Sequence, residues 1–172
     1  MYNDLRGDFA KVSWRKMTCN NTAPSKCLFV TWLAIHGRLP TCDRLSKFEI
    51  QCAQLCTLCK KENETHSHLF FTCEFSKTVW EGATQWSNKN INTSNWQDVM
   101  LCIQSQCNMN KATHQLSRMT LSVTQYMIWN ERNTIIFQGI HHSAQELLRQ
   151  IKEIVYIRGL NTNQMKSLVL RL

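Results

Sequence analysis

The strongest constraint on the fold of this chain is a set of four potential metal ligands within residues 56–73. The spacing is C-x2-C-x8-H-x4-C, and the four residues are Cys56, Cys59, His68 and Cys73. A Cys-x2-Cys turn points both sulfurs at one ion, and a second pair across a loop completes the tetrahedron that zinc prefers with thiolate and imidazole ligands. Because the protein would fill all four positions, we expect one structural Zn²⁺. Its binding free energy, on the order of 10 kcal/mol, would be folding free energy.

Other assignments of these side chains stay open. His66 in place of His68 gives C-x2-C-x6-H-x6-C, but His68 makes the shorter, more usual turn to Cys73, so we favour it. Cys52 can also join the site or replace Cys56. Two alternative interpretations of the cysteines require no metal. The cysteines can be buried free thiols, or the Cys-x2-Cys a redox pair, which is disfavoured because no βαβ pattern surrounds it.

The composition favours long helices. The 172 residues are 43% hydrophobic, enough for a core, and contain only five glycines and two prolines. We therefore predict a mainly α-helical fold. Residues 1–87 form a helical domain with a zinc-knuckle-like loop inserted at residues 52–73, residues 88–95 form a polar linker, and residues 96–172 form a C-terminal helical extension.

Two helices are predicted between Pro24 and the first cysteine of the cluster. Pro24 can open the first helix, which should end near Gly37. Its apolar face is formed by residues at helical spacing, namely Phe29, Trp32, Leu33 and His36. A second, short helix follows, and its core side should carry Leu45 and Phe48.

The C-terminal part also has helix signals. A long helix is expected over about residues 111–137. The last helix should start at a capping box formed by Ser143 and Glu146. We expect Gly159 to end it.

The net charge of +8 lies on both flanks of the cysteine-rich centre. Residues 1–50 carry eight Lys/Arg against four Asp/Glu, and residues 111–172 carry eight against three. Residues 51–110 carry four against five. Phosphate backbones are the natural partner of such basic flanks, because each neutralised phosphate releases counterions.

We expect neither a membrane-spanning segment nor a secretory signal. No run of eighteen apolar residues is present, and the first residues lack the apolar core of a secretory signal. Nine cysteines form an odd set, which argues against a complete disulfide framework. We expect an intracellular protein in a reducing compartment, nuclear or cytoplasmic, without a membrane partner.

A longer series of spaced residues surrounds the four ligands. It runs Trp32-Leu33-Ala34, Gly37-Arg38-Leu39-Pro40-Thr41, Asp43-Arg44-Leu45, Cys56-x2-Cys59, Glu64-Thr65, His68-Leu69-Phe70-Phe71-x-Cys73, Ser76 and Val79-Trp80. This series, over about residues 14–85, resembles the reverse transcriptase zinc-binding domain of plant non-LTR (LINE-type) retrotransposons. Further on, Ile128-Trp129-x-x-Arg132-Asn133-x-x-x-Phe137 resembles the segment that follows the zinc region in those open reading frames.

The resemblance implies an accessory module that contacts template RNA or target DNA and lies next to a reverse transcriptase domain. No Tyr-x-Asp-Asp polymerase site occurs in the chain, and its twelve acidic residues are scattered. We therefore expect no enzymatic activity and no small-molecule substrate. Two alternatives stay open: a protein-interaction or architectural module that docks on a polymerase domain, and a decayed fragment without present function.

Basic side chains on the loop and its flanks are the candidate nucleic-acid contacts: Lys60, Lys61, Arg38, Arg44, Lys47 and Arg132. Knuckle loops present such side chains to single strands. Phe70 and Phe71 can offer a stacking surface, although packing beneath the zinc loop is favoured. Exposed rings at Trp86 and Trp96 would instead favour a protein partner.

Overall fold

The computed structural model describes residues 12, 14–87, 95–105 and 111–172. Within these ranges the chain is helical and has no β-strand, only an isolated antiparallel bridge between Leu55 and Asn63. The mainly α-helical fold is therefore confirmed. The helices are α2 (Arg15–Thr18), α3 (Ser25–Ile35), α4 (Cys42–Ser46), the π-helical turn η1 (His68–Thr72), α5 (Glu74–Trp86), α6 (Trp96–Ser105), α7 (Lys111–Gln138), α8 (Ala144–Leu160) and α9 (Lys166–Val169).

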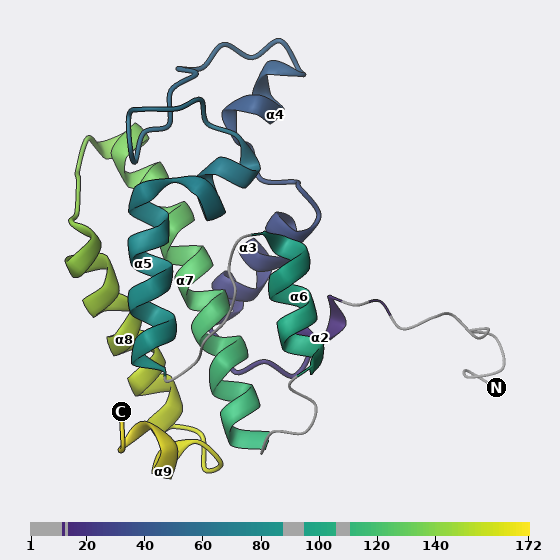
Figure 1. Cartoon of the computed structure of the whole chain (residues 1–172), viewed down its shortest axis with the longest axis vertical. Helices are drawn as coiled ribbons and strands as arrows, with labels where there is room; N and C mark the ends of the chain where they lie inside the picture. Colours follow the sequence, from purple (N-terminus) through teal and green to yellow (C-terminus); the bar gives the residue numbers. More distant parts are fainter. Residues whose placement is uncertain (1–11, 13, 88–94, 106–110) are drawn as a thin grey trace, which may run out of the picture.

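Helix α7 runs through the middle of the molecule and packs against α3, α5 and α8 (Figure 1). Between Leu116 and Trp129 every side chain except that of Tyr126 is buried. A helix with neighbours on several sides has no solvent-facing stripe. Small hydroxyl residues on α7, such as Ser122 and Thr124, are accordingly buried beside large apolar ones.

Helix α8 begins as predicted. The Ser143 hydroxyl accepts a hydrogen bond from the Glu146 amide (3.2 Å), and the Glu146 carboxylate accepts one from the Ser143 amide (2.7 Å). The predicted end at Gly159 is wrong, because α8 continues to Leu160. A Cβ on Gly159 would lie 2.4 Å from a methyl carbon of Val169, so this glycine lets α9 approach the helix backbone.

Helix α3 starts after Pro24 and ends before Gly37, as predicted. Two side chains expected to face the core are instead exposed: Phe29 (61%) and Phe48 (63%). On α3, small residues take the buried face, which consists of Cys27, Thr31 and Ala34. Phe48 lies beyond the end of α4, where the chain turns at Glu49 with a φ of 58°.

Helices from both sides of the predicted linker contribute to one hydrophobic core. Val79 and Trp80 of α5 belong to the same buried cluster as Met119 and Ile128 of α7. The linker itself, residues 88–95, lies outside the described residues except for Asn95. The division into residues 1–87 and 96–172 thus stays a prediction. None of the described helices is long and apolar enough to cross a membrane.

Candidate metal centre

The first two predicted ligands lie on a short hairpin. Its two arms are joined by hydrogen bonds from the Cys56 amide to the Glu62 carbonyl (2.8 Å) and from the Glu64 amide to the Gln54 carbonyl (2.7 Å). The turn closes with a bond from the Lys60 amide to the Cys56 carbonyl (2.8 Å). Lys60 takes the left-handed conformation, with a φ of 56°, which brings the chain back so that both cysteine sulfurs lie on one side.

The other two ligands lie at the ends of the π-helical turn η1. Five residues of α-helix would place His68 and Cys73 about 140° apart around the axis. In η1 the Cys73 amide instead bonds the carbonyl of His68, five residues back (2.9 Å). This wider turn brings both side chains to the hairpin, and π turns recur at functional sites in helices.

Helix α5 holds the π turn in place with two side-chain hydrogen bonds. The Ser76 hydroxyl donates to the carbonyl of Leu69 (2.6 Å), and the Trp80 indole donates to the carbonyl of Phe70 (2.7 Å). Both carbonyl groups are buried and need a donor other than the turn itself. Phe70 and Phe71 are also buried, so they pack beneath the zinc loop and offer no stacking surface.

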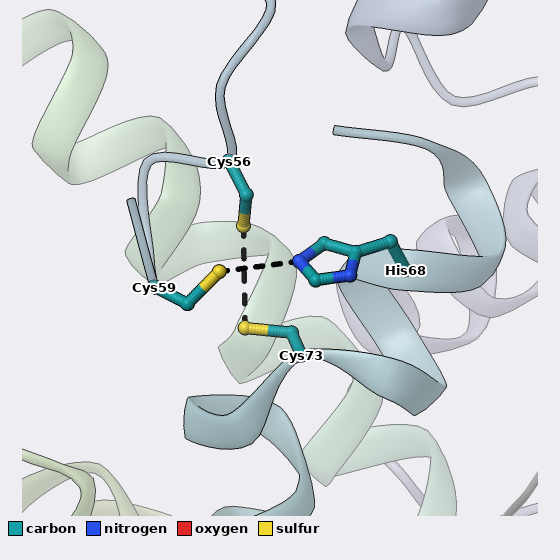
Figure 2. A group of neighbouring side chains, drawn as sticks. All are labelled: Cys56, Cys59, His68 and Cys73. Carbon is teal, nitrogen blue, oxygen red and sulfur yellow. Dashed lines mark hydrogen bonds between the residues drawn. The ribbon is translucent and has the colours of Figure 1, made fainter. Parts of the chain in front are cut away.

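The four predicted ligands come together in one cluster (Figure 2). All four ligand atoms lie within 4.8 Å of one another, with 4.0 Å between the sulfurs of Cys56 and Cys73 and 3.2 Å between the Cys59 sulfur and the His68 Nε2 atom. A tetrahedral zinc with ordinary bond lengths separates sulfur from sulfur by about 3.8 Å and sulfur from nitrogen by about 3.6 Å. The cluster therefore has the size that a zinc ion requires.

The imidazole of His68 is oriented for metal binding. Its Nδ1 atom lies 3.1 Å from a Glu62 carboxylate oxygen and 3.1 Å from the Thr72 hydroxyl, while Nε2 faces the sulfurs. A proton on Nδ1, donated to the carboxylate, leaves the lone pair of Nε2 free for the ion. Metal-bound histidines are commonly held by such a carboxylate behind the ring.

The buried thiols favour a cation in their midst. The hydrogen bond between the two sulfurs lowers the pKa of Cys73 to about 5, and it raises the pKa of Cys56, as does burial. Two thiolates thus cannot share this interior without a positive charge between them. Bound zinc supplies that charge and holds its thiol ligands in the deprotonated form. The donor set and its surroundings fit zinc.

The alternative ligands lie elsewhere. The ring of His66 packs against Phe70 and Trp96, at centroid distances of 5.3 and 6.0 Å, and burial lowers the pKa of His66. The Cys52 sulfur is 3.7 Å from the carbonyl oxygen of Cys42, outside the cluster.

A buried ion pair, which sequence reasoning missed, ties the hairpin to α7. The Arg132 Nη2 atom lies 2.7 Å from one Glu64 carboxylate oxygen, and its Nε atom lies 3.2 and 3.1 Å from the two oxygens. The Cys42 amide donates to the same carboxylate (3.0 Å). Glu64 and Arg132 are only 1% and 4% exposed. Glu64 belongs to the series of spaced residues around the four ligands and Arg132 to the later segment at residues 128–137, but neither pattern reveals the contact.

The candidate nucleic-acid contacts fall into three places. Arg38 lies just after α3, Arg44 lies in α4 and donates to the Gly37 carbonyl (3.0 Å), and Lys47 directly follows α4. Lys60 and Lys61 are exposed on the hairpin, and Lys61 pairs with Glu74 (2.7 Å). Arg132 differs from the expectation, because its guanidinium is buried against Glu64 and offers no donors at the surface.

The rings considered for a protein partner are not fully exposed. Trp86 is half-buried. Trp96 is half-buried too, and it packs edge-on against Phe70 and Phe71 with centroids 5.8 and 5.1 Å away. Both rings therefore contribute to the fold more than to an open surface.

Comparison with known proteins supports the family resemblance. Residues 1–80 match the family described as zinc-binding in reverse transcriptase, which confirms the resemblance over that part of the chain. The assignment to plant non-LTR elements stays a prediction. No curated protein and no solved structure matches the chain.

Proposed function

We infer that this chain, whose residues 1–80 match the zinc-binding region of reverse transcriptases, is a non-catalytic module that holds one structural Zn²⁺ and contacts nucleic acid. The closed ligand set supports the structural role. Three sulfurs and one imidazole nitrogen would occupy all four positions of a tetrahedral zinc ion and leave none for a water molecule or a substrate.

The observation that carries the nucleic-acid contact is the excess of basic side chains on and around α2, α3 and α4. Residues 14–50 carry six Lys/Arg against Asp43 and Glu49. Of the six basic residues, five are exposed: Arg15, Lys16, Lys26, Arg38 and Lys47. Exposed cationic side chains in excess of acidic ones attract phosphate backbones without regard to base sequence.

Fluorescence anisotropy with labelled oligonucleotides at increasing salt tests this proposal. The logarithm of the binding constant should fall linearly with the logarithm of salt concentration, by about 0.7 for each single-strand phosphate contacted. Replacing Arg38 and Lys47 by alanine should weaken binding and flatten the slope. The same change at Arg149 and Arg158, which are exposed on α8, is the matched control. Absence of binding even at low salt would refute the nucleic-acid part.

A protein surface is the second candidate partner, and one observation favours it. Phe48, Ile50 and Leu55 expose more than half of their surface along the loop that leads to the hairpin (63%, 52% and 53%). If the anisotropy assay finds no nucleic-acid binding, docking on a polymerase domain becomes the better account of this end of the molecule.

A further inference from the structure

Two arginine–aromatic pairs meet at the C-terminal end of α3. The Arg38 guanidinium lies 5.3 Å from the centre of the Trp32 ring, and the Arg44 guanidinium lies 5.5 Å from the centre of the Phe48 ring. Both arginines adjoin Gly37, because Arg38 follows it in the chain and Arg44 donates to its carbonyl (3.0 Å). We call these four side chains around Gly37 the Gly37 corner.

The backbone holds this arrangement in place. Gly37 has a φ of 59°, and the amides of Gly37 and Arg38 bond the carbonyls of Ala34 (2.9 Å) and Leu33 (2.8 Å). This is the usual glycine-dependent end of an α-helix, and it turns the chain so that Arg38 lies back over Trp32. The helix carbonyl end also favours positive charge nearby.

The corner is open to solvent. Phe48 is 63% exposed and Arg38 is exposed, while Trp32 and Arg44 are half-buried. The central carbon of each guanidinium lies over one ring, so each pair brings two flat groups together. Flat groups of this kind stack with unpaired bases, on aromatic rings or on arginine planes alike.

Charge alone does not explain the corner. Between residues 32 and 50 the three cations Arg38, Arg44 and Lys47 are opposed by Asp43 and Glu49. The net charge of this segment is thus only +1, so phosphate attraction accounts for part of the binding, and stacking is the interaction in which the corner differs from other basic surfaces. A duplex keeps its bases stacked inside and cannot offer them to such a surface, whereas a single strand can.

We propose that the Gly37 corner binds single-stranded nucleic acid, with unpaired bases stacked on the Trp32–Arg38 and Phe48–Arg44 pairs. Lys47, next to Phe48 and exposed, is placed to meet a phosphate of the same strand. The inference rests on the proposed function and deepens it, because it names the form of nucleic acid and the side chains that select it.

The test compares labelled (dT)12, (U)12 and a 12-base-pair duplex by anisotropy, using the zinc-loaded protein. Phe48→Ala should weaken binding of a single strand by roughly fivefold or more, the usual effect of removing one stacking ring. Arg38→Lys keeps the charge but removes the plane, so it should also weaken single-strand binding. Both variants should leave duplex binding within about twofold of wild type, since stacking does not contribute to it. Binding of (dT)12 or of (U)12 that is weakened by both variants supports the proposal and shows which sugar is accepted.

Matched variants separate stacking from loss of structure. Tyr156→Ala removes an exposed ring from α8, which packs on α5 and α7, and should change nothing. Phe48→Trp should restore single-strand binding, and all variants should retain zinc. If wild type binds no nucleic acid, both this inference and the proposed function fail. If wild type binds single strands and duplex equally and Phe48→Ala and Arg38→Lys have no effect, the inference alone is overturned.

Discussion

Replacing Arg132 by methionine should destabilise the zinc-loaded protein by about 3–5 kcal/mol, because the change leaves the Glu64 carboxylate charged and unpaired in the interior. Glu64 is 1% exposed. Without Arg132, its carboxylate keeps the hydrogen bond from the Cys42 amide (3.0 Å) but has lost its counter-ion. Burial lowers the pKa of Arg132, but the hydrogen bonds and charge of Glu64 outweigh it and leave the pKa raised. The guanidinium is thus charged at every pH at which the protein is folded. In a chain of 172 residues such a loss corresponds to a melting temperature lower by about 6–20 °C.

A double-mutant cycle shows whether the cost comes from the pair. Glu64→Gln should also be costly, since it leaves a buried guanidinium without its counter-ion. The double variant leaves neither charge, so its free energy of unfolding should exceed the additive expectation by about 2 kcal/mol or more. Urea unfolding in excess zinc, followed by tryptophan fluorescence, gives all four values. The exposed pair Lys61–Glu74 has the same 2.7 Å separation and is the control, for which the corresponding changes should have little effect.

Two results would refute the reasoning. One is a cost below about 1 kcal/mol for Arg132→Met, which would mean that Glu64 reaches water or another donor when its partner is removed. The other is strict additivity in the cycle. Either would show that the hairpin is not fastened to α7 through this contact.

Three further predictions concern the hairpin, the π turn and α8. Ser76→Ala removes the donor to the buried Leu69 carbonyl and should lower the free energy of unfolding by about 1–3 kcal/mol in urea titrations; no change would show that water replaces the hydroxyl. Lys60→Gly relieves the backbone strain of the left-handed conformation and should raise the free energy of unfolding by roughly 0.5–1 kcal/mol. A lower free energy of unfolding would mean that the lysine side chain stabilises the turn. The hydrogen bonds of Ser143 lower the pKa of Glu146 below the ordinary 4.5, so its stabilising effect is complete above that value and is lost as pH falls through the lowered pKa. The stability difference between wild type and Glu146→Ala, measured by thermal melts from pH 7 to pH 3, should therefore shrink in acid, and a difference independent of pH would contradict this.

The helical architecture was predictable because it depends on local signals. Pro24, Gly37 and the Ser143–Glu146 capping box each act within one helical turn. In the structure α3 starts and ends, and α8 starts, where these residues predict. The glycine at 159 shows the limit of such signals. The same residue type can end a helix or admit a neighbouring one, and only the position of Val169 decides between them.

Contacts between distant segments could not be predicted from one sequence. Spacing along α3 and α4 does not reveal which face a partner helix covers, so Phe29 and Phe48 were expected in the core and are exposed. The Glu64–Arg132 pair joins residues 68 positions apart. Buried Glu131 likewise accepts hydrogen bonds from the amide and the Nδ1 atom of His142, at 2.7 and 2.8 Å. From sequence alone, a charged residue in a helix is predicted to be exposed to solvent, because its buried partner is not known.

The ligand set is the opposite case, because its spacing is itself the signal. A Cys-x2-Cys turn and a His-x4-Cys pair are each local, and the chemistry of zinc requires them to meet. The spacing could not show how the backbone brings the two pairs of ligands together. The π turn brings His68 and Cys73 to one side, and Glu62 lies behind the imidazole.

Metal analysis of the purified chain by native mass spectrometry tests the central claim most directly. The account predicts one zinc per chain, loss of the fold by circular dichroism after exhaustive chelation, and recovery when zinc is returned. Replacement by serine at Cys56, Cys59 or Cys73, or by alanine at His68, should abolish zinc binding. Cys52→Ser and His66→Ala should retain it. A chain that stays folded and metal-free after chelation, or one whose zinc depends on Cys52 or His66, would contradict the account.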